Sequence, residues 1–589
     1  MRYRTLFLSL TLLLIGDLTH AYGAGDIAQR TEKLNALIAE QWQYTMEQSP
    51  EFATAVGDYR YNNRWSDMSL AHVRADRRAT ERFLHRFMEV STDGLAEQDR
   101  LNHELMVQQL RESIESTDLK LYEMPVDQFS GIQIGLPGTV PTIPFDTVRQ
   151  YEDYIARLNG IPRLLLDVTE VLKQGRKDGM MPPRFLLEKV VDQTKAIGAP
   201  AGLSNAFGQP ALKFPESIST ADRKRLQALI VYAVNTKVRP AYQRFAAYLE
   251  KEYAPFGRER AGLWSLPNGD RLYEFQVRRQ TTTAMRPQDI HDLGLREVAR
   301  IEGEMAAVAQ TLGFKDLASF RVSVSGDPSQ HATSREQILE LYRGYIAGIE
   351  PKLPNLFGLL PKTPVEVRAV QEYREQEAAG AEYSPGTPDG TRPGIVFVNT
   401  GSFAQRELQT VESTAYHEGL PGHHMQISIA QALPELPLFR QNAGYTAYVE
   451  GWALYSERLG KDIGLYQNPY SDYGRLVSEL LRADRLALDT GVHYKHWTRE
   501  QMIEFFHAHP AGDEPTFQAE TDRYIAVPGQ ALCYKLGQLK FLALRDRAKA
   551  VLGERFDIRA FHDQMLKGGA LPLSILEARF DAWLSEVSH

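Results

Sequence analysis

The sequence predicts a mainly α-helical protein with a large helical body and one small β-sheet. Of its 589 residues, 43% are hydrophobic and 24% are charged, which is typical of a globular protein. Apolar residues recur at helical spacing over most of the chain, whereas the run IVFVNT at 395–400 has the composition of a strand. We therefore expect one large helical domain over residues 24–589, with two lobes as the alternative.

The first 23 residues have the features of a secretory signal peptide. Arg2 and Arg4 precede an apolar run from Leu6 to Ile15, and small residues follow near Ala21. The run is short for a transmembrane helix. We expect cleavage, export to the periplasm or the medium, and no stable membrane insertion; an uncleaved membrane anchor is the alternative.

Net charge and cysteine content exclude some classes of partner and of metal site. The formal net charge is −8, so nucleic acid is not expected as a partner. The chain has one cysteine, Cys533, and therefore no internal disulfide. A zinc site in this chain cannot be built from cysteines.

Helical patterns follow one another along the chain and are interrupted by several Gly/Pro-rich loops and one strand-like run. Glycines and prolines in SGIQIGLPGTVPTIPF, residues 130–145, predict a loop, and the strand-like run at 395–400 comes later. The strand could pair with an extended peptide if it lies at a sheet edge, or it could be a packed core strand. The helical stretches cover residues 31–45, 72–115, 148–197, 221–253, 287–305, 445–457 and most of 470–589.

Residues 412–426, ESTAYHEGLPGHHMQ, combine His417, Glu418, His423 and His424. Neutral imidazole is the commonest transition-metal ligand, and zinc hydrolases keep a glutamate base beside the first histidine. The spacing differs from HExxH, in which the histidines are four residues apart. Six residues of unbroken helix rise about 9 Å, whereas two imidazoles on one zinc need nitrogens about 3.3 Å apart.

The residues between the histidines offer a solution. Pro421 cannot donate to the helix ladder, and Gly419 and Gly422 tolerate many backbone conformations. We expect the helix to bulge by two residues here, which would bring His423 to the second ligand position. His424 would then flank the metal, although it remains an alternative ligand.

A third ligand is expected from the helix at 445–457, YTAYVEGWALYSE. Of its two glutamates, Glu450 is the better candidate, because it follows His423 by 27 residues and has mostly apolar neighbours. A carboxylate in such surroundings needs a partner. The alternative is a structural or vestigial histidine cluster.

The strings HEGLPGHHMQ, YVEGWALYSE and ETDRYIAVPGQALCYKLG resemble a bacterial family known as domain of unknown function 885. That family is similar to the gluzincin zinc peptidases, such as angiotensin-converting enzyme, thimet oligopeptidase and carboxypeptidase Taq. The resemblance implies a helical fold with a deep cleft, His417 and a second histidine as ligands, Glu418 as base and Glu450 as third ligand. It also implies that Tyr524, after Arg523, steadies the oxyanion.

These observations together predict an exported zinc-dependent peptidase that hydrolyses short peptides, with Glu418 as general base. One alternative is a metal-dependent amidase acting on a modified or non-peptide amide. The other is a secreted binding protein with a vestigial metal site.

Overall fold

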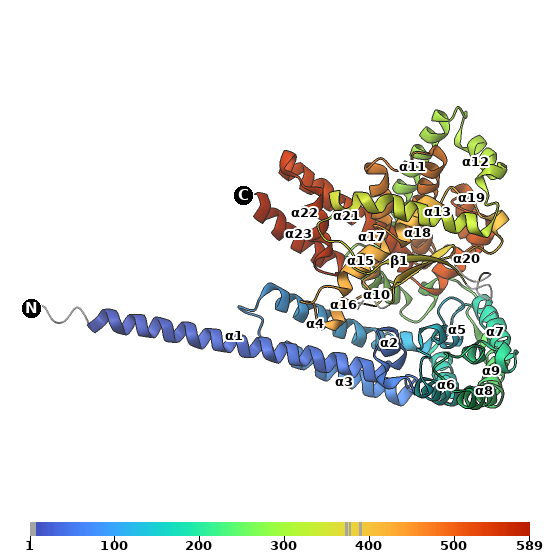
Figure 1. The fold of residues 1–589 in the computed structure, drawn as a ribbon, viewed down its shortest axis with the longest axis horizontal. Coiled ribbons are helices and arrows are strands. Elements are labelled where there is room, and N and C mark those ends of the chain that lie inside the picture. The colour runs from blue at the N-terminus through green and yellow to red at the C-terminus, as the bar shows by residue number, and fades with distance from the viewer. Residues whose placement is uncertain (1–6, 371–374, 376–378, 388–391, 589) are drawn as a thin grey trace, which may run out of the picture. The chain divides into compact units, whose positions relative to one another are not determined.

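The computed structural model describes residues 7–370, 375, 379–387 and 392–588, and it confirms a mainly α-helical fold with a small sheet (Figure 1). The chain divides into two compact units, Met1–Glu259 and Arg260–His589. Among the described residues, no helix combines the length and apolar character needed to cross a membrane.

The α-helices of the first unit are α1 (Phe7–Gln48), α2 (Pro50–Ala55), α3 (Leu70–Met88), α4 (Glu97–Asp118), α5 (Ile132–Gly138), α6 (Val148–Asp178), α7 (Arg184–Gly198), α8 (Thr220–Ala233) and α9 (Arg239–Tyr248). The second unit contains α10 (Gly269–Thr281), α11 (Pro287–Thr311), α12 (Leu317–Ser325), α13 (Arg335–Ile349), β1 (Val365–Ala369), β2 (Ala381–Ser384), β3 (Gly394–Val398), α14 (Val411–Glu418), α15 (His423–Gln431), α16 (Leu438–Gln441), α17 (Thr446–Asp462), α18 (Pro469–His493), α19 (Arg499–Ala508), α20 (Glu514–Ala526), α21 (Cys533–Leu552), α22 (Ile558–Leu566) and α23 (Leu573–Ser588).

The core of the first unit forms around α6, which packs against α8 and α9. Thr147 and Gln150 cap the start of α6 reciprocally, and Gly179 ends it in the left-handed region. Its core face repeats at helical spacing, with Leu158, Ile161 and Leu165 all buried. The unit therefore has its own hydrophobic core.

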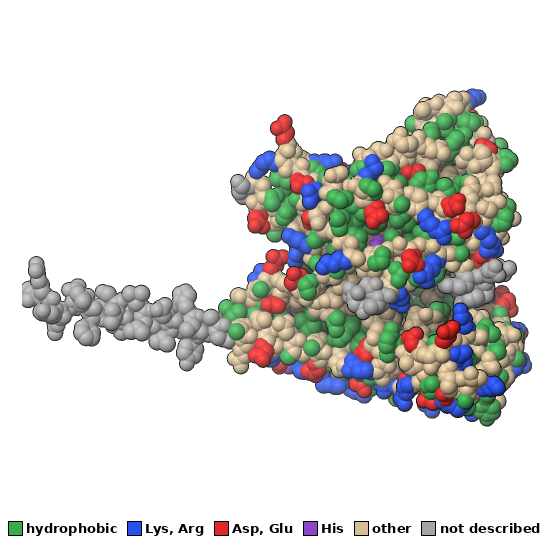
Figure 2. Space-filling model, in the orientation of Figure 1, with side chains coloured by type: hydrophobic (Ala, Val, Ile, Leu, Met, Phe, Trp, Pro, Cys, Tyr) green, Lys and Arg blue, Asp and Glu red, His purple; other side chains and the backbone are tan. Residues whose placement is uncertain are grey.

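Helix α1 begins within the predicted signal peptide, and the charged helix α3 comes after it in the chain. Of the predicted signal peptide, residues 1–6 lie outside the described part, and 7–23 belong to the backbone of α1. Its cleavage stays a prediction. Arg74, Arg78 and Arg82 on α3 are exposed, and Figure 2 shows acidic and basic side chains interspersed on the face that it presents.

The loop predicted at 130–145 is partly wrong, because these residues contain α5 and a 3-10 turn at Val140–Thr142. Pro137 lies inside α5 and cannot donate to the carbonyl of Gln133. The buried Tyr242 hydroxyl donates to that carbonyl instead, at 2.9 Å. Leu136 is buried in the core at the same place, so tertiary contacts outweigh the helix-breaking residues.

Glu123, buried in the first unit, predicts a dependence of stability on pH. Burial, together with the charge of Asp178, raises the pKa of Glu123 from 4.5 to about 7. The folded chain therefore keeps this proton between pH 4.5 and about 7, while the unfolded chain loses it, so stability falls as pH rises through that window. Glutamine does not titrate. We therefore expect the free energy of unfolding of Glu123→Gln to fall across this window by about 1 to 3 kcal/mol less than that of the unmodified chain.

Thermal unfolding of the full chain at several pH values measures this difference. The exposed Glu188 provides the control, because Glu188→Gln replaces a carboxyl with an amide without changing a buried group. Equal pH dependence in Glu123→Gln and the unmodified chain would contradict the prediction.

The sheet of the second unit has the strand order β1-β3-β2. The central strand, β3, runs parallel to β1 and antiparallel to β2, with Val396 opposite Val367 and Tyr383. This strand is the predicted IVFVNT run, and pairing on both sides excludes it as an edge for an incoming peptide. The edge strand β2 packs against α14, so the sheet lies beside the helix that carries His417.

The helices behind the sheet pack in close pairs, α11 with α18 and α17 with α21. At Gly537 on α21, an added Cβ atom would lie 1.9 Å from the carbonyl oxygen of Ala447 on α17. Glycine is therefore required for this approach. The contact holds α17, which carries Glu450, in a fixed place in the core.

Candidate metal centre

The predicted bulge within one helix is a complete break in the structure. Helix α14 ends at Glu418 and α15 begins at His423, with residues 419–422 forming a buried loop that contains a cis Leu420–Pro421 bond. An added Cβ atom on Gly422 would lie 2.0 Å from the carbonyl oxygen of His417. The chain thus folds back tightly on the end of α14, and only glycine fits there.

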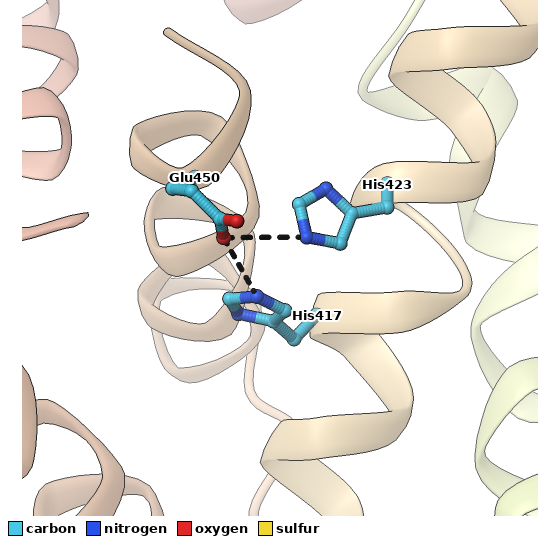
Figure 3. A group of neighbouring side chains, drawn as sticks. All are labelled: His417, His423 and Glu450. Atoms are coloured by element: carbon cyan, nitrogen blue, oxygen red, sulfur yellow. Dashed lines mark ion pairs between the residues drawn. The ribbon is translucent and has the colours of Figure 1, made fainter. Parts of the chain in front are cut away.

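The loop brings together the three predicted ligands. His417 from α14 and His423 from α15 point toward Glu450 on α17 (Figure 3). The Nε2 atoms of His417 and His423 lie 3.5 and 3.4 Å from Oε2 of Glu450. One ligand atom from each residue falls within 4.8 Å of the other two, and the side chains are largely buried.

These distances fit a zinc ion. Ligand atoms at about 2.0 to 2.1 Å from a tetrahedral zinc are separated by about 3.3 Å. An ordinary N–H···O hydrogen bond would be shorter, at about 2.7 to 3.2 Å. Two imidazoles and one carboxylate are also a donor set of catalytic zinc sites, which leave the fourth position for water. The residues present therefore suit this metal.

Glu457 also lies against the cluster, although the sequence analysis did not select it. Its Oε1 lies 2.7 Å from Nδ1 of His417, so the imidazole donates there and leaves Nε2 free to face the metal position. Arg482 on α18 lies 3.9 Å from the same oxygen. Glu457 follows Glu450 by seven residues, two turns on one face of α17, and this spacing was the available signal.

The charges in the site shift one another's pKa values. Burial disfavours the charged form of His417, but the carboxylates of Glu450 and Glu457 outweigh it and raise its pKa to about 9. Burial opposes the charge of Glu450 too, yet both histidines hold the pKa of this carboxyl well below its usual range.

Glu418 differs from Glu450, because burial raises its pKa more than the neighbouring His417 and His423 lower it. A carboxylate with a raised pKa is a better proton acceptor near neutral pH. The two glutamates therefore divide into a permanently charged group and a proton-exchanging one.

His424 turns away from the cluster. Its Nδ1 lies 3.0 Å from the Tyr383 hydroxyl on β2, and its ring also bonds the backbone of Thr363. Burial lowers its pKa to about 4, so the ring is neutral. His424 therefore links α15 to strand β2 through its hydrogen bond with Tyr383.

We expect His423→Ala to weaken zinc binding much more than His424→Ala, because only the first removes an imidazole that faces Glu450. Zinc content after gel filtration measures the difference. His424→Ala should instead lower the unfolding temperature, since it breaks the contact with Tyr383. The reverse order of zinc loss would make His424 the ligand.

Arg523 and Tyr524 on α20 both bind Glu520 on the same helix. The fully buried Tyr524 hydroxyl donates to Glu520 and lies 3.1 Å from Nε of Arg485. Arg523 donates to Gln530 and to the Tyr534 hydroxyl. The oxyanion role of Tyr524 stays a prediction.

Comparison with known proteins places most of the chain in one family. The family described as "Bacterial protein of unknown function (DUF885)" matches residues 50–580, and no curated protein matches. A candidate lipoprotein from Colwellia psychrerythraea is similar at 30% identity and a TM-score of 0.90, over 95% of this chain and 100% of that one. A candidate lipoprotein of unknown function from Shewanella oneidensis shares the fold, with 18% identity and a TM-score of 0.70 over 93% and 99%. The family match spans most of the chain, so this protein belongs to the DUF885 family.

Proposed function

We propose that the protein is an exported zinc-dependent peptidase that hydrolyses short peptides. The observation that carries the proposal is the convergence of His417, His423 and Glu450 at ligand spacing, with Glu418 next to the first of them. Glu457 supports it, because metal-binding histidines commonly donate their second ring N–H to a carboxylate.

In the proposed reaction, the three ligands and Glu418 have different roles. A zinc ion held by the three ligands would polarise the scissile carbonyl and make water more acidic. Glu418 takes the proton from the attacking water and later delivers it to the departing amine, so that one water adds across the broken C–N bond. Its raised pKa supports this exchange.

Export is proposed on two grounds. The first 23 residues combine two arginines, an apolar run and small residues, the pattern of a secretory signal. The similar proteins from Colwellia psychrerythraea and Shewanella oneidensis are candidate lipoproteins. The N-terminal sequence of protein recovered from the medium or periplasm after expression would test cleavage near residue 23.

Metal analysis and a peptide digest test the proposed chemistry. Protein purified without chelator should hold about one zinc per chain, and a peptide library should be cleaved in a way that a chelator stops and added zinc restores. Cleavage of other amides but not of plain peptides would favour an amidase. Protein that binds no metal, even after zinc is added, would contradict the proposal.

A further inference from the structure

The buried loop between the two ligand helices is held by α17. The carbonyl oxygen of Pro421 accepts the indole N–H of Trp452 at 2.9 Å. The hydroxyl of Ser456 shares its proton between this oxygen, at 3.3 Å, and the carbonyl oxygen of Trp452, at 3.0 Å. Residues 420–422 of the loop are all buried. Trp452 and Ser456 therefore provide the hydrogen bonds that water would otherwise give to an exposed loop.

Such support is needed because Pro421 lies in the loop between α14 and α15, and it has no N–H of its own. A buried carbonyl without a partner is costly, so a loop that lost these donors would shift until its carbonyl found others. Such a shift moves His423, which stands two residues after Pro421.

The indole of Trp452 is held firmly in its place. Trp452 has no exposed surface, and its ring meets those of Phe357, Phe541 and His562 edge to face, at centroid distances of 6.2, 5.4 and 5.8 Å. A side chain enclosed in this way cannot follow a moving loop. It can therefore set the position of the carbonyl that it binds.

The same helix also carries the proposed ligand Glu450 and the His417 partner Glu457. Glu450 lies two residues before Trp452 on α17, and Glu457, which binds His417, follows one residue after Ser456. Through these four side chains α17 contacts both histidines or the segment that leads to them. The relative position of the three ligands thus depends on one rigid element.

We propose that Trp452 is a positioning residue of the metal centre: its hydrogen bond to Pro421, assisted by Ser456, fixes His423 at ligand distance from Glu450. This inference rests on the zinc site of the proposed function, and it adds a group that does not touch the metal. Outer partners of metal ligands typically change metal affinity by about 10- to 100-fold.

Zinc affinity and stability together separate positioning from a general effect on folding. Tyr448 gives a matched control, because it is also fully buried on α17 and donates to a backbone carbonyl, that of Met565, at 2.7 Å. Trp452→Phe and Tyr448→Phe each remove one buried donor. Ser456→Ala removes only a hydroxyl and covers the case in which Trp452→Phe does not fold.

The experiment measures zinc dissociation constants by competition with a chelating dye, thermal stability of the zinc-free chains, and the visible spectrum of the cobalt-substituted proteins. We expect zinc binding about 10- to 100-fold weaker in Trp452→Phe, a smaller loss in Ser456→Ala, and an altered cobalt spectrum in both. Tyr448→Phe should lose stability but keep the affinity and spectrum of the unmodified protein.

Two results would overturn the inference, and they have different meanings. If Trp452→Phe and Ser456→Ala bind zinc as tightly as the unmodified chain, with the same cobalt spectrum, the positioning role is wrong while the zinc site stands. If the unmodified chain binds no zinc, the proposed function and the positioning role both fail.

Discussion

Glu450→Ala is expected to lose most of its zinc, with affinity reduced by more than about 100-fold. Loss of a hydrogen-bond partner of a ligand already weakens metal binding by about 10- to 100-fold, and Glu450 is proposed as a ligand itself. Its carboxylate also lies close to both histidines, with Oε2 at 3.5 Å from Nε2 of His417 and 3.4 Å from Nε2 of His423. Its removal leaves two imidazoles to hold a divalent cation.

A graded series makes this result specific. Glu457→Gln keeps all three ligands but removes the charged acceptor of the His417 N–H, so it should weaken zinc binding by about 10- to 100-fold. Glu435→Ala changes an exposed glutamate and should leave zinc binding unaltered. Zinc content by mass spectrometry and competition titration rank the variants. Full zinc retention by Glu450→Ala would remove Glu450 from the ligand set.

The helices of this protein can be predicted from sequence because their apolar residues repeat locally. Helix α11 begins at the predicted Pro287, and its buried stripe includes Ile290, Val298, Ile301 and Met305. The same holds for β3, whose apolar run reflects burial as a central strand. Local pattern and tertiary burial agree in these elements.

Strands β1 and β2 show where local pattern is insufficient. Both are half-buried or exposed, with mixed sequences, and they become strands because β3 offers a partner on each side. Helix α5 is a similar case, since the Tyr242 hydroxyl donates to the carbonyl of Gln133, to which Pro137 cannot donate. The structure of these elements is therefore determined by partners that are distant in the sequence.

The candidate site divides in the same way. The group of His417, His423 and Glu450 is predictable, because its ligand residue types and their spacing occur within two short stretches of the sequence. The break at Gly422 is larger than the expected bulge, since that expectation treated α14 and α15 as one helix. The hydrogen bond from Trp452 to Pro421 depends on how α17 packs, which spacing alone does not reveal.

Glu418→Gln is expected to keep its zinc and to lower kcat by about 10² or more, the contribution of general acid–base catalysis. Glutamine preserves the shape of the side chain but cannot accept the proton of the attacking water. Zinc content and kcat, measured on one peptide that the unmodified enzyme cleaves, separate chemistry from metal binding.

Glu412 supplies the matched control for Glu418, because it is a buried glutamate on the same helix that accepts hydrogen bonds from the Tyr416 hydroxyl and the Tyr466 N–H. Glu412→Gln should lower stability and leave kcat near normal, since its carboxylate holds α14 to the following chain. A loss of kcat confined to Glu418→Gln, at full zinc content, assigns the proton transfer to Glu418. Near-normal turnover by Glu418→Gln would mean that another group activates the water.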